Sequence, residues 1–167
     1  MIVRQPSGAE VEEASALYIV AEVSIGLAGF TGVIAALQGR DGWHPIDVWR
    51  VVALLCITFS ALFLALIPVG LHAAGLSDSS VWRISGGLGV AAIVVGYIII
   101  KRYEPPDGMA QQGAYNLAGS ALGVILLLLH ILTTVLAAFW PFFFALLTIL
   151  LLSSFQFSNI LLLRPNR

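Results

Sequence analysis

The sequence predicts an all-α integral membrane protein, a helix bundle of five transmembrane helices in a single domain covering residues 1–167. Hydrophobic residues make up 59% of the chain and charged residues 10%, against roughly 45–50% and 25% in soluble domains. The mean hydropathy of +0.98 indicates the same class. Apolar segments long enough to cross a bilayer alternate with short polar segments rich in glycine and proline. This composition leaves little room for a soluble domain.

The first three helices are expected at residues 14–38, 47–73 and 81–100. Residues 1–13 contain one Arg and three Glu, which is not typical of a cleavable signal peptide. Gly39, Gly42 and Pro45 end the first helix, and Asp47 is placed to cap the second. Pro68 lies in the last third of the second helix, where we expect a kink. The polar turn before residue 81 then separates the second helix from the third.

The last apolar segment, residues 114–163, is too long for one spanning helix. It would extend about 75 Å at 1.5 Å per residue, more than twice the ~30 Å hydrocarbon core. Pro141 follows Phe139 and Trp140 near its middle, where an interfacial aromatic anchor and a proline in the first helical turn both fit. We therefore expect two helices, at residues 114–138 and 141–163, with a four-helix protein as the alternative.

The distribution of basic residues favours five helices over four. The five-helix arrangement gives one side of the membrane six basic residues and the other side two, whereas four helices would give four and four. Cytoplasmic segments carry the excess of Lys and Arg, so we expect the N-terminus outside and the C-terminus in the cytoplasm. The six residues are Arg40, Arg50, Lys101, Arg102, Arg164 and Arg167, and the two are Arg4 and Arg83.

Glu22 is the most costly residue of the predicted bundle. It lies about two turns inside the first apolar helix, where a carboxyl costs roughly 2–3 kcal/mol at the helix centre and less toward an interface. A helical projection places it in a stripe of small and polar residues, which helices in lipid often use to contact one another. Three helices carry such stripes: Ser15, Tyr18, Glu22, Gly26 and Gly29; Ser85, Gly89, Ala92 and Gly96; Asn116, Gly119, Ser120, Gly123, His130 and Thr134.

Helix direction predicts a partner for Glu22. Glu22 lies about eight residues from the start of its helix and His130 about eight from the end of the fourth, so both are expected at a similar depth below the outer surface. We expect the two side chains to meet. The pair would handle protons or cations in a water-accessible cavity, or it would only lock the bundle. The candidate polar pathway comprises Glu22, His130, Tyr18, Asn116, Ser120 and Thr134.

Other kinds of site are weakly supported by the sequence. His72 and His130 are possible haem ligands, and Glu22, His130 and His72 are a possible metal set, but the expected depths disfavour the first and no ligand spacing supports the second. We expect no catalytic, cofactor-binding or metal-binding residues. The single cysteine, Cys56, excludes an internal disulfide, and a net charge of −1 gives no reason to expect nucleic acid as a partner.

Four short motifs resemble those of a family of small bacterial multi-spanning membrane proteins with no known activity. The motifs are GFTGVIAAL, WHPIDVWRVVALL, ALFLALIPVGL and VWRIS, and the likeness covers residues 22–85. The resemblance implies location in the bacterial inner (cytoplasmic) membrane, and it carries over no functional residue.

These observations lead to a ranked expectation of function. The first is a small homo-oligomeric ion or proton channel or transporter-like protein, with a pore between protomers because five short helices enclose little space. The second is a non-transporting accessory subunit or scaffold of a membrane complex, and a membrane enzyme is third. The expected partners are the lipid bilayer and further copies of the chain, and the sequence names no other protein.

Overall fold

The computed structural model describes residues 8–37, 45–103 and 113–162. Within these ranges it contains five α-helices and no strand: α1 (Gly8–Leu37), α2 (Pro45–Ala73), α3 (Asp78–Tyr103), α4 (Gly113–Leu136) and α5 (Phe139–Leu162). The five-helix prediction is confirmed, including the division of the last apolar segment just before Pro141. The four-helix alternative is wrong. The largest difference in bounds is at α1, which begins at Gly8 rather than at residue 14.

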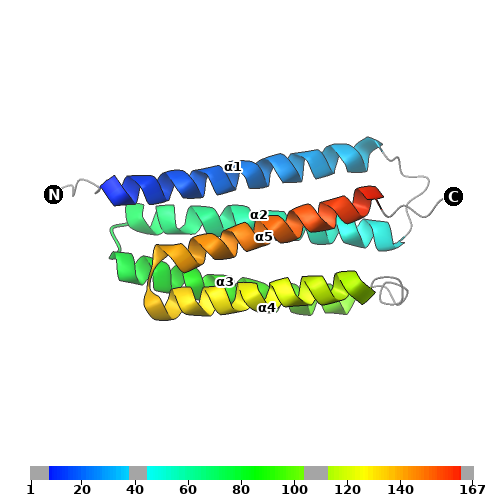
Figure 1. The fold of residues 1–167 in the computed structure, drawn as a ribbon. Helices are drawn as coiled ribbons and strands as arrows, with labels where there is room; N and C mark the ends of the chain where they lie inside the picture. Colours follow the sequence, from blue (N-terminus) through cyan, green and yellow to red (C-terminus); the bar gives the residue numbers. More distant parts are fainter. Residues whose placement is uncertain (1–7, 38–44, 104–112, 163–167) are drawn as a thin grey trace.

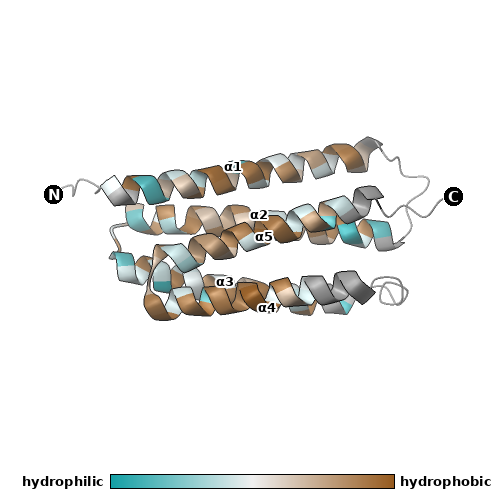
Figure 2. Cartoon of the chain, in the orientation of Figure 1, coloured by the Kyte–Doolittle hydropathy of each residue, from teal (hydrophilic) through white to brown (hydrophobic). Residues whose placement is uncertain are grey.

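All five helices are long and apolar enough to cross a membrane, over the segments Val11–Ala36, Asp47–Ala73, Asp78–Ile99, Gly119–Leu136 and Phe139–Ser158. Figure 2 shows apolar residues along the middle of the bundle and hydrophilic residues gathered toward its ends. This pattern fits a protein whose middle zone faces hydrocarbon and whose ends reach water.

The helices run side by side, with α5 in contact with each of the other four (Figure 1). α1 lies at one edge, against α2 and α5, while α3 and α4 form a pair on the other side. α1 begins at the end of the bundle opposite to the end where α5 finishes. This arrangement is what an odd number of antiparallel spans produces.

The two short connections at one end of the bundle both use the left-handed backbone conformation. Gly75, with φ of 82°, ends α2, and the amides of Leu76 and Gly75 donate to the carbonyls of Leu71 and His72. These two bonds form the glycine-terminated cap that satisfies the last carbonyls of a helix. Ala137, with φ of 50°, links α4 to α5 in the same conformation.

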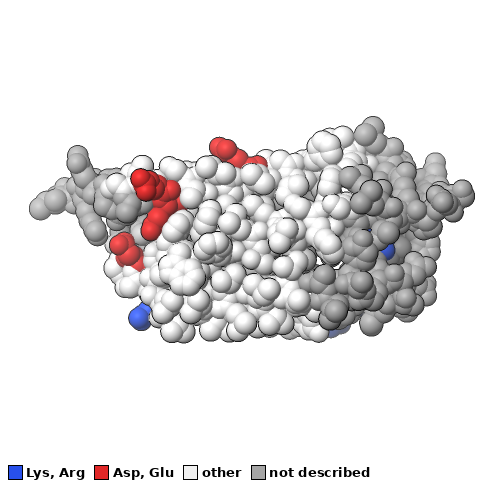
Figure 3. All heavy atoms as spheres, viewed as in Figure 1, with Lys and Arg blue, Asp and Glu red and all other residues white. Residues whose placement is uncertain are grey.

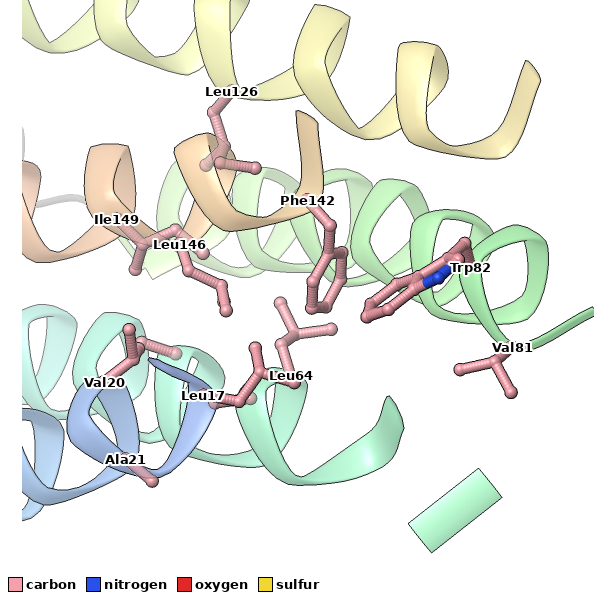
Figure 4. Packing of buried hydrophobic residues seen from close by; sticks show 13 residues of the cluster. Leu17, Val20, Ala21, Leu64, Val81, Trp82, Leu126, Phe142, Leu146 and Ile149 are labelled. Atoms are coloured by element: carbon pink, nitrogen blue, oxygen red, sulfur yellow. The ribbon is translucent and has the colours of Figure 1, made fainter. Parts of the chain in front are cut away.

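The interior contains an apolar cluster to which every helix contributes (Figure 4). Leu17 comes from α1, Leu64 from α2, Trp82 from α3 and Leu126 from α4, and Phe142 of α5 lies at the centre with no exposed surface. The rings of Trp82 and Phe142 are in contact, with centroids 5.8 Å apart and planes tilted by 50°. The cluster fixes α5 between the other helices and so determines which face of each helix points outward.

Candidate functional site

The polar stripe of α1 faces away from the bundle, opposite to the prediction. All five of its members are exposed: Ser15, Tyr18, Glu22, Gly26 and Gly29. α1 instead buries a face formed by Leu17, Val20, Ala21, Ser24 and Thr31. At 100° per residue, these two sets lie on nearly opposite sides of the helix. The expectation that the stripe would face the interior is therefore wrong.

The physical reason is that the buried face of α1 also includes small and weakly polar residues, Ala21, Ser24 and Thr31, beside its apolar ones. The Ser24 hydroxyl donates to the carbonyl of Val20 at 2.8 Å, and that of Thr31 donates to Leu27 at 2.7 Å. Each hydroxyl is satisfied within its own helix, so it enters the interior without needing a partner. Polarity alone therefore did not identify the inward side of this helix, and both sides fit close helix packing.

Glu22 lies on the outward face near the centre of the spanning segment. The spanning segment of α1 runs from Val11 to Ala36. Glu22 lies 11 residues after its first residue and 14 before its last, so about 16 Å of helix separates Glu22 from the Val11 end. Figure 3 shows acidic groups at the end of the bundle where α1 begins and another part-way along the α1 side. In the described part of the chain, Glu22 takes part in no salt bridge or hydrogen bond. The carboxyl group of Glu22 therefore faces the surroundings of the protomer on the α1 side.

His130 occupies a different part of the molecule, between α3, α4 and α5. Its side chain has 0% exposure. The imidazole lies against Gly89 of α3, and its ring makes an edge-to-face contact with Phe142 of α5, with centroids 5.6 Å apart. Neither ring nitrogen has a hydrogen-bond partner among the described residues. The predicted contact between Glu22 and His130 is therefore wrong, because one residue faces outward from α1 and the other is enclosed on the far side of α5.

The other residues of the predicted pathway do not converge on one point. Tyr18 is 48% exposed on the Glu22 face, and Ser120 is exposed on α4. Thr134 is half-buried, and its hydroxyl donates to the carbonyl of His130 at 2.9 Å. Asn116 belongs to α4, but its side chain lies outside the described residues. Only His130 and Thr134 share a location, and Tyr18 and Glu22 share another.

The α3 stripe is buried at Ser85 and Gly89 and half-buried at Ala92 and Gly96. The neighbouring Gly86, which the sequence did not single out, also packs against α4. A Cβ added at Gly89 would collide with the His130 ring, and one added at Gly86 would lie 2.9 Å from the His130 carbonyl oxygen. These two glycines let α3 and α4 approach closely. The adjacent pair of glycines in the segment GGLG (residues 86–89) is the sequence feature that could have predicted the close packing at Gly86.

His72 lies at the end of α2, apart from His130. Its Nδ1 is 3.8 Å from Asp78 Oδ1, and its ring contacts Trp82 edge-on at a centroid distance of 5.8 Å. Trp82 and Phe142 separate it from His130 in a chain of ring contacts. The described residues contain no group of three or more His, Cys, Asp or Glu side chains that could hold a metal ion. The geometry gives no support to the haem pair or to the metal set.

Three of the basic residues used to predict orientation are described. Arg83 and Arg102 are exposed, whereas Arg50 is buried, with Nη1 3.5 Å from Asp47 Oδ1 one turn earlier in α2. Burying the stem of an arginine against neighbouring helices is common near the ends of spanning segments. The side chains of Arg4, Arg40, Lys101, Arg164 and Arg167 lie outside the described residues.

Comparison of the chain with protein-family models, with curated proteins and with solved structures finds no match. The family resemblance of residues 22–85 therefore stays a prediction. The functional argument rests on the two locations described above, the outward face of α1 and the enclosed His130.

Proposed function

We propose that the protein is a self-associating membrane protein whose protomers meet at the α1 stripe, and that Glu22 lines a path for protons or cations between them. The observation that supports this most directly is the position of Glu22, which is exposed near the centre of a spanning helix. A charged side chain there is costly against lipid and usually faces a protein interior or a water-filled space. A neighbouring protomer would provide either a protein interior or a water-filled space around Glu22.

The glycines of α1 support close approach by another helix. A Cβ added at Gly26, Gly29 or Gly32 would meet nothing within 4 Å. Packing within the protomer therefore does not require glycine at these positions, although each costs roughly 1 kcal/mol relative to alanine in a helix. Small residues on a lipid-exposed face allow a neighbouring backbone to approach closely.

Polar groups beside Glu22 fit the same proposal. Tyr18 lies one turn earlier on the same exposed face, so its hydroxyl in one protomer is available to the Glu22 carboxylate of the next. Glu12, near the start of α1, and Asp78, at the start of α3, are exposed, and these two helix starts lie at the same end of the bundle (Figure 1). Acidic groups at an entrance raise the local concentration of cations. With the orientation expected from the basic residues, this end would face outside, and the resemblance of residues 22–85 implies the bacterial inner membrane as the location.

A second candidate is an accessory subunit that presents the same α1 stripe to a different membrane protein. The observation that favours it is the packed interior of the protomer, in which His130 is enclosed by Gly89 and Phe142 and makes no contact with Glu22. For an accessory subunit, the interior of one protomer does not need to contain a path for ions or protons. In this case Glu22 would satisfy a group of the partner protein.

Cysteine cross-linking identifies the face that associates. Cys56 is exposed, so it is first replaced by alanine. Single cysteines are then placed at Gly29 on the α1 stripe and at Leu128, which is 59% exposed on α4. We expect oxidation in the membrane to give covalent dimers of the Gly29→Cys protein and few of the Leu128→Cys protein. Equal cross-linking at both positions would contradict association through α1.

Flux measurement then separates the two candidates. The purified protein is reconstituted in liposomes, and proton and monovalent cation flux is measured for the wild type, for Glu22→Gln and for the control Glu12→Gln at the bundle end. A path lined by Glu22 predicts that the first substitution abolishes flux and the second reduces it only slightly. Dimers without flux would refute the channel and favour the accessory subunit.

A further inference from the structure

Two buried polar residues, Ser85 of α3 and His130 of α4, are not accounted for by the proposed function. His130 and Ser85 each have 0% exposure. Both ring nitrogens of His130 and the hydroxyl oxygen of Ser85 lack a hydrogen-bond partner among the described residues. Buried polar side chains are nearly always hydrogen-bonded to protein or to ordered water, because an unsatisfied one costs about 1–3 kcal/mol. Unsatisfied atoms on both of two helices in contact therefore call for an explanation, and the Ser85 hydroxyl and Nδ1 of His130 have a common one.

Ser85 differs from the other buried hydroxyl residues of the described chain. Ser24, Thr31, Thr58, Thr133 and Ser153 each donate to the carbonyl four residues earlier, at 2.7–2.9 Å. The equivalent acceptor for Ser85 is the carbonyl of Val81, and the Ser85 hydroxyl does not use it. The Ser85 hydroxyl is therefore available to donate a hydrogen bond to a group outside its own helix.

The spacing between Ser85 and His130 selects the size of the bridging group. Gly89 lies directly against Nδ1 and Cε1 of the imidazole, and Ser85 is four residues earlier on the same face of α3. Residues at this spacing have Cβ positions about 5–6 Å apart. The Ser85 hydroxyl and Nδ1 of His130 do not bond each other directly, and two consecutive hydrogen bonds of about 2.8 Å each would cover a separation of about 5–6 Å. One small molecule that both donates and accepts fits between the two groups.

We propose that Ser85 and His130 form a buried site for a single water molecule, which bridges the Ser85 hydroxyl and Nδ1 of His130. Buried waters typically make about three hydrogen bonds to groups that would otherwise be unsatisfied. The nearby hydroxyl of Thr134 already donates to the His130 carbonyl, so it remains able to accept a third bond. With Nδ1 accepting from water, neutral His130 carries its proton on Nε2.

The site is tested by nitrogen and water NMR on the protein in nanodiscs. Histidine is labelled with ¹⁵N, and the His130 signals are assigned by their loss in His130→Gln. We expect the tautomer protonated on Nε2, a hydrogen-bonded shift at Nδ1, and a magnetisation-transfer peak between water and the His130 ring. Ser85→Ala should remove that water peak and move Nδ1 toward its unbonded shift. The control Ser24→Ala, whose buried hydroxyl bonds within α1, should change neither signal.

Two results would overturn the proposal. A wild-type water peak that is absent while Nδ1 is hydrogen-bonded would show a direct bond between Ser85 and His130. An unbonded Nδ1 shift in the wild type would show that no bridge exists. Both results come from the wild-type protein, so the test does not depend on whether Ser85→Ala folds.

Discussion

Replacing Gly86 by alanine tests the closest contact between α3 and α4. The added Cβ would lie 2.5 Å from Thr134 Oγ1 and 2.9 Å from two backbone atoms, the His130 carbonyl oxygen and the Thr134 nitrogen. Comfortable separations begin at about 3.5 Å, so the two helices must separate by about 0.6 Å at this point. Backbone atoms cannot rotate away as a side chain does. We expect Gly86→Ala to lower the free energy of unfolding by about 1–3 kcal/mol, the usual cost of overpacking.

The neighbouring residue provides a matched control. Gly87 is exposed, and a Cβ at this position would meet nothing within 4 Å. Gly87→Ala should be neutral or stabilising by up to about 1 kcal/mol, because alanine is the better helix former. The two substitutions are chemically identical and adjacent in one helix, so only the contact with α4 distinguishes them.

Thermal unfolding in detergent, followed by circular dichroism, measures the difference. A change of 1 kcal/mol shifts the midpoint by about 2–4 °C in a chain of this size, so Gly86→Ala should unfold several degrees below Gly87→Ala. Adding Thr134→Ala removes the contact at Oγ1 but neither backbone contact, and it should rescue Gly86→Ala only in part. Equal midpoints for the two glycine variants, or complete rescue by Thr134→Ala, would refute the reasoning.

Three further predictions follow from the arrangement of the helices. Glu22→Gln and His130→Ala should have additive effects on stability, within about 0.3–0.5 kcal/mol, because the residues make no contact; a larger coupling energy in a double-mutant cycle would place them together. Phe142→Ala should cost about 3–5 kcal/mol by emptying the centre of the core, whereas Phe63→Ala, on a side chain 62% exposed, should change the unfolding midpoint little. Topology reporters fused to the two ends of the chain should be active on opposite sides of the membrane, the C-terminal one in the cytoplasm, and reporters active on the same side would exclude five spans.

The helices themselves were predictable because the membrane imposes a length and an apolar composition on each span. Pro141 and the two aromatic residues before it identified the α4–α5 boundary, and the structure has its connection at residues 137–138. The early start of α1 at Gly8 was missed, because Glu10, Glu12 and Glu13 are favourable in the first turns of a helix even though they are polar. A hydropathy argument detects the part of a helix within the membrane and not its extension into water.

The inward face of each helix was predictable only where the stripe was needed for packing within the protomer. Ser85 and Gly89 of α3 are buried as predicted, and Gly89 is needed there because an added Cβ would collide with the His130 ring. The same reasoning failed for Glu22, because lipid supplies no hydrophobic force that drives apolar residues inward. Polar and small residues in a spanning helix therefore indicate a contact without saying whether the contact lies within one chain or between two.

Comparing Gly86 with Gly29 distinguishes a contact within one chain from a contact between two chains. Gly86 is fixed by atoms of its own chain, whereas Gly29 faces open space on the protomer surface. If Gly29 serves only the protomer, replacing it gains helix propensity and loses nothing. If it serves association through α1, the same change keeps or raises the stability of the protomer and weakens the dimer.

We therefore expect Gly29→Ala to raise the unfolding midpoint of the dilute protein in detergent slightly, since alanine is favoured over glycine by roughly 1 kcal/mol in a helix interior. We also expect a lower efficiency of energy transfer between donor-labelled and acceptor-labelled protomers in liposomes. Leu128→Ala on the exposed face of α4 should leave energy transfer unchanged. A Gly29→Ala protein that associates as strongly as the wild type would show that the open side of α1 faces lipid alone, and Glu22 would then need another explanation.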